Sequence, residues 1–137
     1  MKRISTLLLA TLLLVSAAAG QQPKLSPNLA SLVAAERAFA RTSVEKGIRD
    51  SFLAFFADDG INFQPHPVKT REAILKRPAP AKRPPVTLNW EPAYADVSQA
   101  GDLGYTTGPY VLTDQSPQPS PPRYGFYFFG LEETKRR

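Results

Sequence analysis

The chain contains no cysteine, and this absence sets several classes of protein aside at once. Without cysteine there are no disulfides, no lipid anchor on a cysteine and no thiolate ligands for zinc. A single histidine, His66, is also too few for a conventional zinc site built from imidazoles. Glycine-rich phosphate loops and the G-x-S-x-G motif are missing as well. The sequence therefore predicts a domain held together by core packing, with no metal and no cofactor.

Long hydrophobic runs are scarce, and the one that exists lies at the N-terminus. Lys2 and Arg3 precede an apolar stretch at residues 7–15, and small residues follow it. This arrangement is typical of a secretory signal peptide, and the apolar stretch is too short to span a bilayer. We therefore expect residues 1–20 to be a signal peptide and residues 21–28 to be a lead segment. The mature protein is expected to be secreted or periplasmic, without a stable membrane anchor.

Charge of one sign does not dominate the chain. The formal net charge is +5 over 137 residues, and the basic residues are scattered apart from short clusters such as the one at residues 135–137. Nucleic-acid binding needs a dense basic patch or stripe. The sequence therefore predicts no nucleic-acid partner.

Two helices are predicted near the start of the mature chain. Ser26 and Pro27 form a helix start, and Lys46 and Gly47 form a helix stop. Apolar residues recur between these signals with the helical period, which predicts one long amphipathic helix. A short aromatic helix, which Asp50 can cap, follows it.

Strand patterns dominate the rest of the chain. Helices first and strands afterwards is an α+β order, in which a curved antiparallel sheet closes over the long helix as a cone with an apolar interior. Proline-rich segments at 78–85 and 114–122 are expected to be loops. The remaining expected elements are a brief strand at 61–66, a short helix at 71–77 capped by Thr70, and strands at 86–97 (with Pro92 at a bulge or an edge position), 103–113 and 123–129.

The order of these elements, with the motifs LVAAERAFA, AFFADDGINF, TREAI and AGDLGYTTGPY, resembles the nuclear-transport-factor-2-like superfamily. Within it the chain is similar to the SnoaL-like and calcium/calmodulin-kinase-association-domain-like branch and to exported domains of unknown function. The resemblance covers residues 29–129 and implies a cystatin-like cone, a long helix wrapped by a curved sheet with a pocket at its open end. Members include isomerases, cyclases, dehydratases and non-catalytic binding or assembly domains, so the fold does not decide the function.

The chain departs from the family pattern after residue 129. Family members continue with a charged turn and a last strand, whereas residues 130–137 form a short polar tail here. We expect the reading frame to be shifted or truncated near Gly130, which would remove a strand and leave a sheet edge open. Because an open edge favours pairing with another chain, a homodimer through the sheet is a predicted assembly.

Three residues are candidates for acid–base chemistry. Glu36 interrupts the apolar stripe of the long helix, so it either points into a cavity, forms a structural ion pair with an arginine from a facing strand, or lies at a wetter rim. His66 lies between two prolines, either as a general base at the pocket mouth or as a surface histidine. Tyr105 could stand for the pocket tyrosine that the resemblance implies. No complete acid–base set maps onto the chain, so the sequence favours binding over catalysis.

The aromatic side chains either line an apolar ligand pocket or form ordinary core packing. A small apolar or aromatic ligand held in the cone is the predicted partner. Two alternatives stay open, a SnoaL-like isomerase or lyase and a non-catalytic oligomerising accessory domain. The residues expected to line the pocket are Phe39, Phe56, Phe63, Trp90, Tyr105 and Tyr127.

Overall fold

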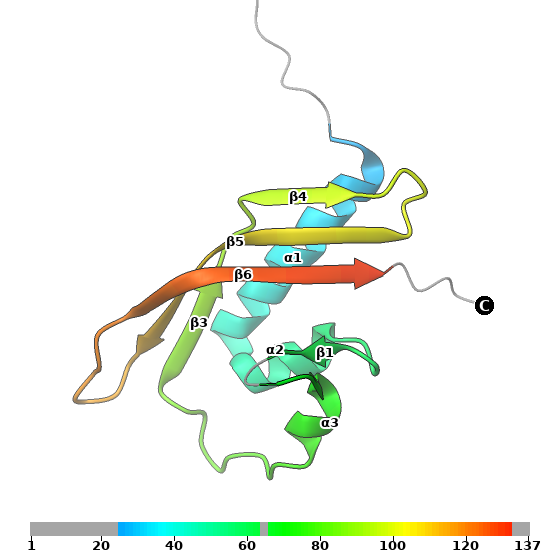
Figure 1. Cartoon of the computed structure of the whole chain (residues 1–137). Helices are drawn as coiled ribbons and strands as arrows, with labels where there is room; N and C mark the ends of the chain where they lie inside the picture. The colour runs from blue at the N-terminus through cyan, green and yellow to red at the C-terminus, as the bar shows by residue number, and fades with distance from the viewer. Residues whose placement is uncertain (1–24, 64–65, 133–137) are drawn as a thin grey trace, which may run out of the picture.

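The protein is an α+β domain, described by a computed structural model over residues 25–63 and 66–132 (Figure 1). The expected signal peptide, residues 21–24 of the lead segment and residues 133–137 of the polar tail lie outside these residues. Figure 1 views the sheet from its outer face, with the long helix behind it. No helix in the described part of the chain has the length and apolar character needed to cross a bilayer.

The long helix α1 spans Pro27–Lys46, where its local signals place it. The Ser26 hydroxyl accepts a hydrogen bond from the Leu29 backbone N–H at 3.3 Å, and Gly47 ends the helix with a φ of 95°. Helix α2, Ile48–Phe55, begins directly after this glycine, so the predicted cap by Asp50 is wrong. Asp50 lies instead in the first turn of α2, where a carboxylate is favoured by the helix dipole.

The main sheet is antiparallel and is organised around its longest strand. Strands β3, Val86–Trp90, and β4, Tyr94–Val97, both pair with one edge of β5, Leu103–Asp114. Strand β6, Arg123–Glu132, pairs with the other edge of β5. The single strand predicted for residues 86–97 is therefore two strands, and the strand predicted to end at 129 continues to Glu132.

Gly108 explains why β3 and β4 are separate. A Cβ at this position would lie 2.1 Å from the Glu91 carbonyl oxygen and 2.8 Å from the Ala93 nitrogen. The segment between β3 and β4, which contains Pro92, therefore presses against the backbone of β5 where glycine leaves room. The Ala93 N–H still reaches the Thr107 carbonyl at 2.9 Å, so the segment stays attached to the sheet as a bulge.

The smaller elements lie together below the sheet in Figure 1. Strands β1, Ile61–Asn62, and β2, Val68–Lys69, pair with each other, and β2 was not predicted. Helix α3, Thr70–Leu75, starts at Thr70, so the prediction that Thr70 caps a helix beginning at 71 is wrong. The chain is already helical at Thr70, and its buried hydroxyl has no hydrogen-bond partner in the described part of the chain.

The core between α1 and the sheet is small and mostly aromatic. Among the described residues only Phe39, Ala40 and Trp90 are buried apolar side chains. The centroid of the Phe39 ring lies 4.7 Å from that of the Trp90 ring. The Phe39 ring also contacts four other rings: two from α2, one from the residue directly after α2, and one from β6. We call the whole group the aromatic cluster: Phe39, Phe52, Phe55, Phe56, Trp90, Tyr127 and Phe129.

Candidate functional site

Glu36 lies on the face of α1 that packs against the sheet, with only 2% of its surface exposed. The Trp90 indole N–H donates to its Oε1 at 2.5 Å, and the Thr106 hydroxyl donates to its Oε2 at 2.9 Å. Both carboxyl oxygens are therefore held by neutral donors from β3 and β5. The predicted arginine partner and the predicted wetter rim are both wrong, because these two donors satisfy the carboxyl inside the core.

The surroundings of Glu36 change how it and its neighbour Tyr127 titrate. Burial raises the pKa of Glu36, while the hydrogen bonds from Trp90 and Thr106 act in the opposite direction. Burial and the nearby Glu36 carboxylate together raise the pKa of Tyr127 to about 12. The nearby Thr106 hydroxyl lowers the pKa of Tyr127 and so offsets part of this rise. The buried Tyr127 hydroxyl itself has no hydrogen-bond partner of good geometry among the described residues.

The group formed by Glu36, Trp90, Thr106 and Tyr127 is a polar island inside the aromatic cluster. A carboxyl with a raised pKa can exchange a proton near neutral pH more readily than an ordinary glutamate. A neutral phenol can donate a hydrogen bond to a carbonyl or hydroxyl oxygen. The arrangement can therefore anchor one polar atom of an otherwise apolar ligand, or supply an acid–base group.

We expect Glu36→Gln to change how stability depends on pH. Because the folded pKa of Glu36 is raised, its contribution to stability is fully present below the unfolded pKa and is lost as pH rises through the folded value. Glutamine resembles the protonated acid and keeps hydrogen bonds to Trp90 and Thr106. The free energy of unfolding of the variant minus that of the parent should therefore increase from pH 4 toward pH 8, as measured by urea titration. A difference that stays constant with pH would contradict the raised pKa.

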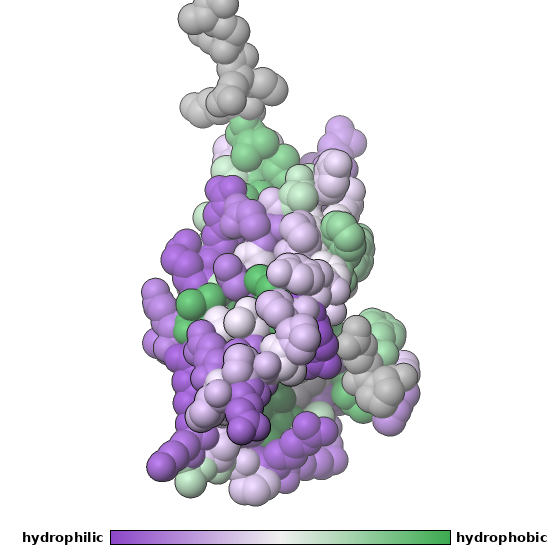
Figure 2. Space-filling view, turned by 90° about the vertical axis from the view of Figure 1, so that its left-hand side faces the viewer, coloured by the Kyte–Doolittle hydropathy of each residue, from purple (hydrophilic) through white to green (hydrophobic). Residues whose placement is uncertain are grey.

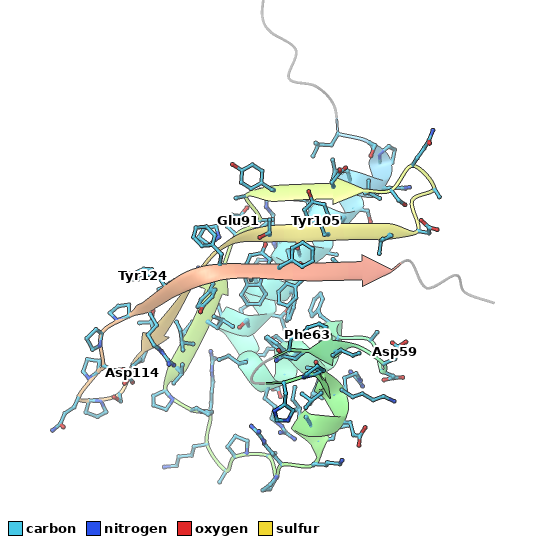
Figure 3. The ribbon with its side chains drawn as sticks, in the orientation of Figure 1. Asp59, Phe63, Glu91, Tyr105, Asp114 and Tyr124 are labelled. Carbon is cyan, nitrogen blue, oxygen red and sulfur yellow. The ribbon has the colours of Figure 1, made fainter. Side chains whose placement is uncertain are left out.

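The structure brings together four of the six residues predicted to line a pocket. Phe39, Phe56, Trp90 and Tyr127 all belong to the aromatic cluster. Phe63 is 70% exposed on the segment after β1 (Figure 3).

The other predicted acid–base candidates lie away from Glu36. Tyr105 lies on the outer face of the sheet, where its ring stacks on Phe128 at 5.4 Å, and the next residue, Thr106, points to the core instead. His66 is exposed. Sequence reasoning missed Thr106 and Phe129, although the period-two pattern of β5 and β6 contains the signal for both.

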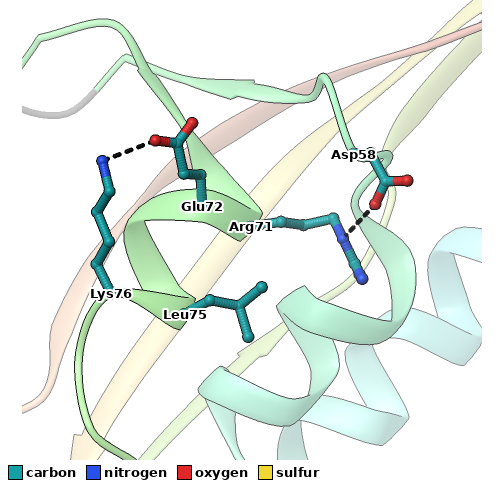
Figure 4. A pocket seen from close by; sticks show the side chains of 5 residues that line it. All are labelled: Asp58, Arg71, Glu72, Leu75 and Lys76. Carbon is teal, nitrogen blue, oxygen red and sulfur yellow. Dashed lines mark ion pairs between the residues drawn. The ribbon is translucent and has the colours of Figure 1, made fainter.

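Two surface hollows lie apart from the polar island. The first, about 450 Å³, is bordered by Arg71 and Asp58, paired at 2.8 Å, and by Lys76 and Glu72, paired at 2.7 Å (Figure 4). Since each charge there already has an opposite partner, no single charge is left to select a ligand. The second, about 280 Å³, is apolar and lies between the start of α1 and β4; its lining is Leu25, Leu29, Val33, Pro92, Ala93, Tyr94 and Ala95.

Comparison of the chain with protein-family models, with curated proteins and with solved structures finds no match. The resemblance to the nuclear-transport-factor-2-like superfamily therefore stays a prediction. What the protein does has to be inferred from the side chains described above.

Proposed function

We propose that the chain is an exported domain with a cystatin-like, nuclear-transport-factor-2-like cone that binds a small apolar or aromatic ligand. The observation that carries this proposal is that part of the aromatic cluster is exposed to solvent. Phe52, Phe56, Tyr127 and Phe129 pack against the buried core and yet remain partly exposed. Aromatic walls beside a few convergent polar groups are characteristic of small-molecule sites.

The polar island supports a more specific version of this proposal. The buried Tyr127 hydroxyl has no hydrogen-bond partner among residues 25–63 and 66–132, and leaving a buried donor unpaired costs about 1–3 kcal/mol. A ligand oxygen that accepted this hydrogen bond would remove that cost. Glu36, which accepts hydrogen bonds from Trp90 and Thr106, lies close enough to Tyr127 to act on its pKa. The favoured ligand is therefore an aromatic or apolar molecule with one carbonyl or hydroxyl group.

Trp90 is the only tryptophan of the chain, so its fluorescence reports directly on this site. We expect acetophenone to quench Trp90 in a saturable way and to raise the melting temperature, and ethylbenzene, which lacks the carbonyl, to bind more weakly. Tyr127→Phe should lower the ratio of the affinity for acetophenone to the affinity for ethylbenzene about fivefold, because one neutral hydrogen bond is worth about 1 kcal/mol.

The matched pair of variants for this experiment comes from β6. Phe129→Ala removes a ring from the aromatic cluster and should weaken acetophenone binding, whereas Phe126→Ala removes a ring that is 82% exposed on the other face and should not. Quenching that never saturates, or an equal loss in both variants, would overturn the proposed site.

Acid–base catalysis is a second candidate function, favoured by the raised pKa of Glu36 beside the Tyr127 hydroxyl. In that case the chain should speed the exchange of the acetophenone methyl protons in D₂O, followed by NMR. Glu36→Gln should remove this exchange while acetophenone still quenches Trp90 in a saturable way. Exchange no faster than in buffer alone would exclude this chemistry for an enolisable ketone.

A further inference from the structure

The outer face of the sheet carries an unusual number of exposed apolar side chains. On β5 and β6 the residues that point toward α1 alternate with residues that point away from it, as Thr106 and Phe129 do with their neighbours. The side chains that point away, with their exposed fractions, are Tyr94 (74%), Leu103 (56%), Tyr105 (37%), Tyr124 (76%), Phe126 (82%) and Phe128 (68%).

Strand register joins these side chains into one patch, which we call the outer patch. Tyr94 lies opposite Thr107, and Thr107 lies opposite Phe128, so one row crosses β4, β5 and β6. Tyr105 stacks on Phe128 and links this row to the next. In Figure 3, Tyr124 lies toward the β5–β6 hairpin and Tyr105 lies farther along the sheet, whereas the surface on the side of the hairpin is mainly hydrophilic (Figure 2).

Charge is absent from the two strands that form most of the outer patch. Residues 103–113 of β5 and residues 124–131 of β6 include no Asp, Glu, Lys or Arg. The solvent-facing side of an antiparallel sheet normally carries polar residues in alternation with the core positions. An uncharged apolar face on this scale marks an interaction surface.

The area of the outer patch matches what a stable dimer needs. The exposed fractions of its six side chains add up to about four complete side chains, or roughly 800 Å² at about 200 Å² for each. Two copies would bury about 1,600 Å², which is the standard size of a specific protein–protein interface.

We propose that a second copy of this chain packs face to face on the outer patch, as a two-fold dimer. Apart from Asp96 of β4, which lies opposite Tyr105, the described part of this face carries no charge beside the patch. The patch therefore needs no partner of opposite charge, and two copies meet there with little repulsion. A two-fold axis brings the same apolar residues together from both sides. The Tyr105–Phe128 stack lies within the patch and is its expected hot spot, because large aromatic side chains near the middle of an interface dominate binding energy. This proposal is independent of the ligand site, which lies on the other face of the sheet.

Sedimentation equilibrium of the purified chain tests the dimer. We expect dimers across a range of about 1 to 100 µM, and a dissociation constant raised about thirtyfold or more by Phe128→Glu. Leu75→Glu is the matched control, since Leu75 is 62% exposed on α3 and lies outside the patch. Both variants should melt at the parent temperature when measured at nanomolar concentration, where every chain is a monomer.

Tyr94→Glu separates face-to-face packing from pairing along the edge of β6. Tyr94 lies on β4, two strands away from β6, whose second edge has no partner among the described strands. Face-to-face packing predicts that Tyr94→Glu weakens the dimer, whereas edge pairing predicts no effect. A monomer at 100 µM, a dimer unaffected by Phe128→Glu, or a dimer unaffected by Tyr94→Glu would each overturn the proposal.

Discussion

Replacing Phe39 with alanine is expected to lower the free energy of unfolding by about 3–5 kcal/mol. Phe39 is 5% exposed, and its ring contacts five others contributed by α2, the residue after it, β3 and β6. Removing the ring leaves a cavity where α1 meets the sheet. Because domains of this size are stable by only about 5–15 kcal/mol, the loss would be a large part of the total.

The measurement is urea unfolding followed by Trp90 fluorescence, at a concentration below the dissociation constant of the dimer. Leu75→Ala is the control, since it removes an apolar side chain that is 62% exposed and should cost less than about 1 kcal/mol. Equal losses for the two variants would mean that the aromatic cluster is not the core of the domain.

Local signals were enough to predict α1. The Ser26 cap, Pro27 in the first turn and Gly47 at the end all act within a few residues of the helix ends, and the structure confirms each of them. The general α+β order is also confirmed, since the helices and strands follow one another as predicted, apart from the additional strand β2. The cone shape and the family resemblance remain predictions.

The partners of Glu36 could not be predicted, because they lie far away along the chain. Trp90 is 54 residues from Glu36, and Thr106 is 70 residues away. The pattern of β5 separates Tyr105 from Thr106, but alternation alone does not say which of the two faces is turned toward the helix. That choice is made by the packing of α1, which places Thr106 inside and Tyr105 on the outer patch.

The role of Gly108 also could not be predicted from the sequence alone. Its replacement is the second change with a large expected effect. A glycine inside a strand is typical of a bend or a bulge. The reason for glycine at position 108 is the approach of the Glu91 carbonyl, which only the paired strands reveal. We expect Gly108→Ala to cost about 3 kcal/mol or more, because the new methyl group meets backbone atoms that no side-chain rotation can move. Gly130→Ala is the matched control, since a Cβ there has nothing within 4 Å. It should be neutral or slightly stabilising, as alanine restricts the unfolded chain.

The Gly108 variant should also disturb the polar island, because Gly108 lies opposite Tyr127 on β6 and close to the backbone that directly follows β3. The added methyl group pushes the Glu91 backbone away from β5, and Trp90, the neighbour of Glu91, donates to Glu36. Trp90 emission and acetophenone quenching should therefore change in Gly108→Ala and remain at parent values in Gly130→Ala. If Gly108→Ala lost stability with an unchanged Trp90 signal, the bulge would support the sheet alone. A coupled change would mean that the bulge also positions the carboxyl at the centre of the proposed ligand site.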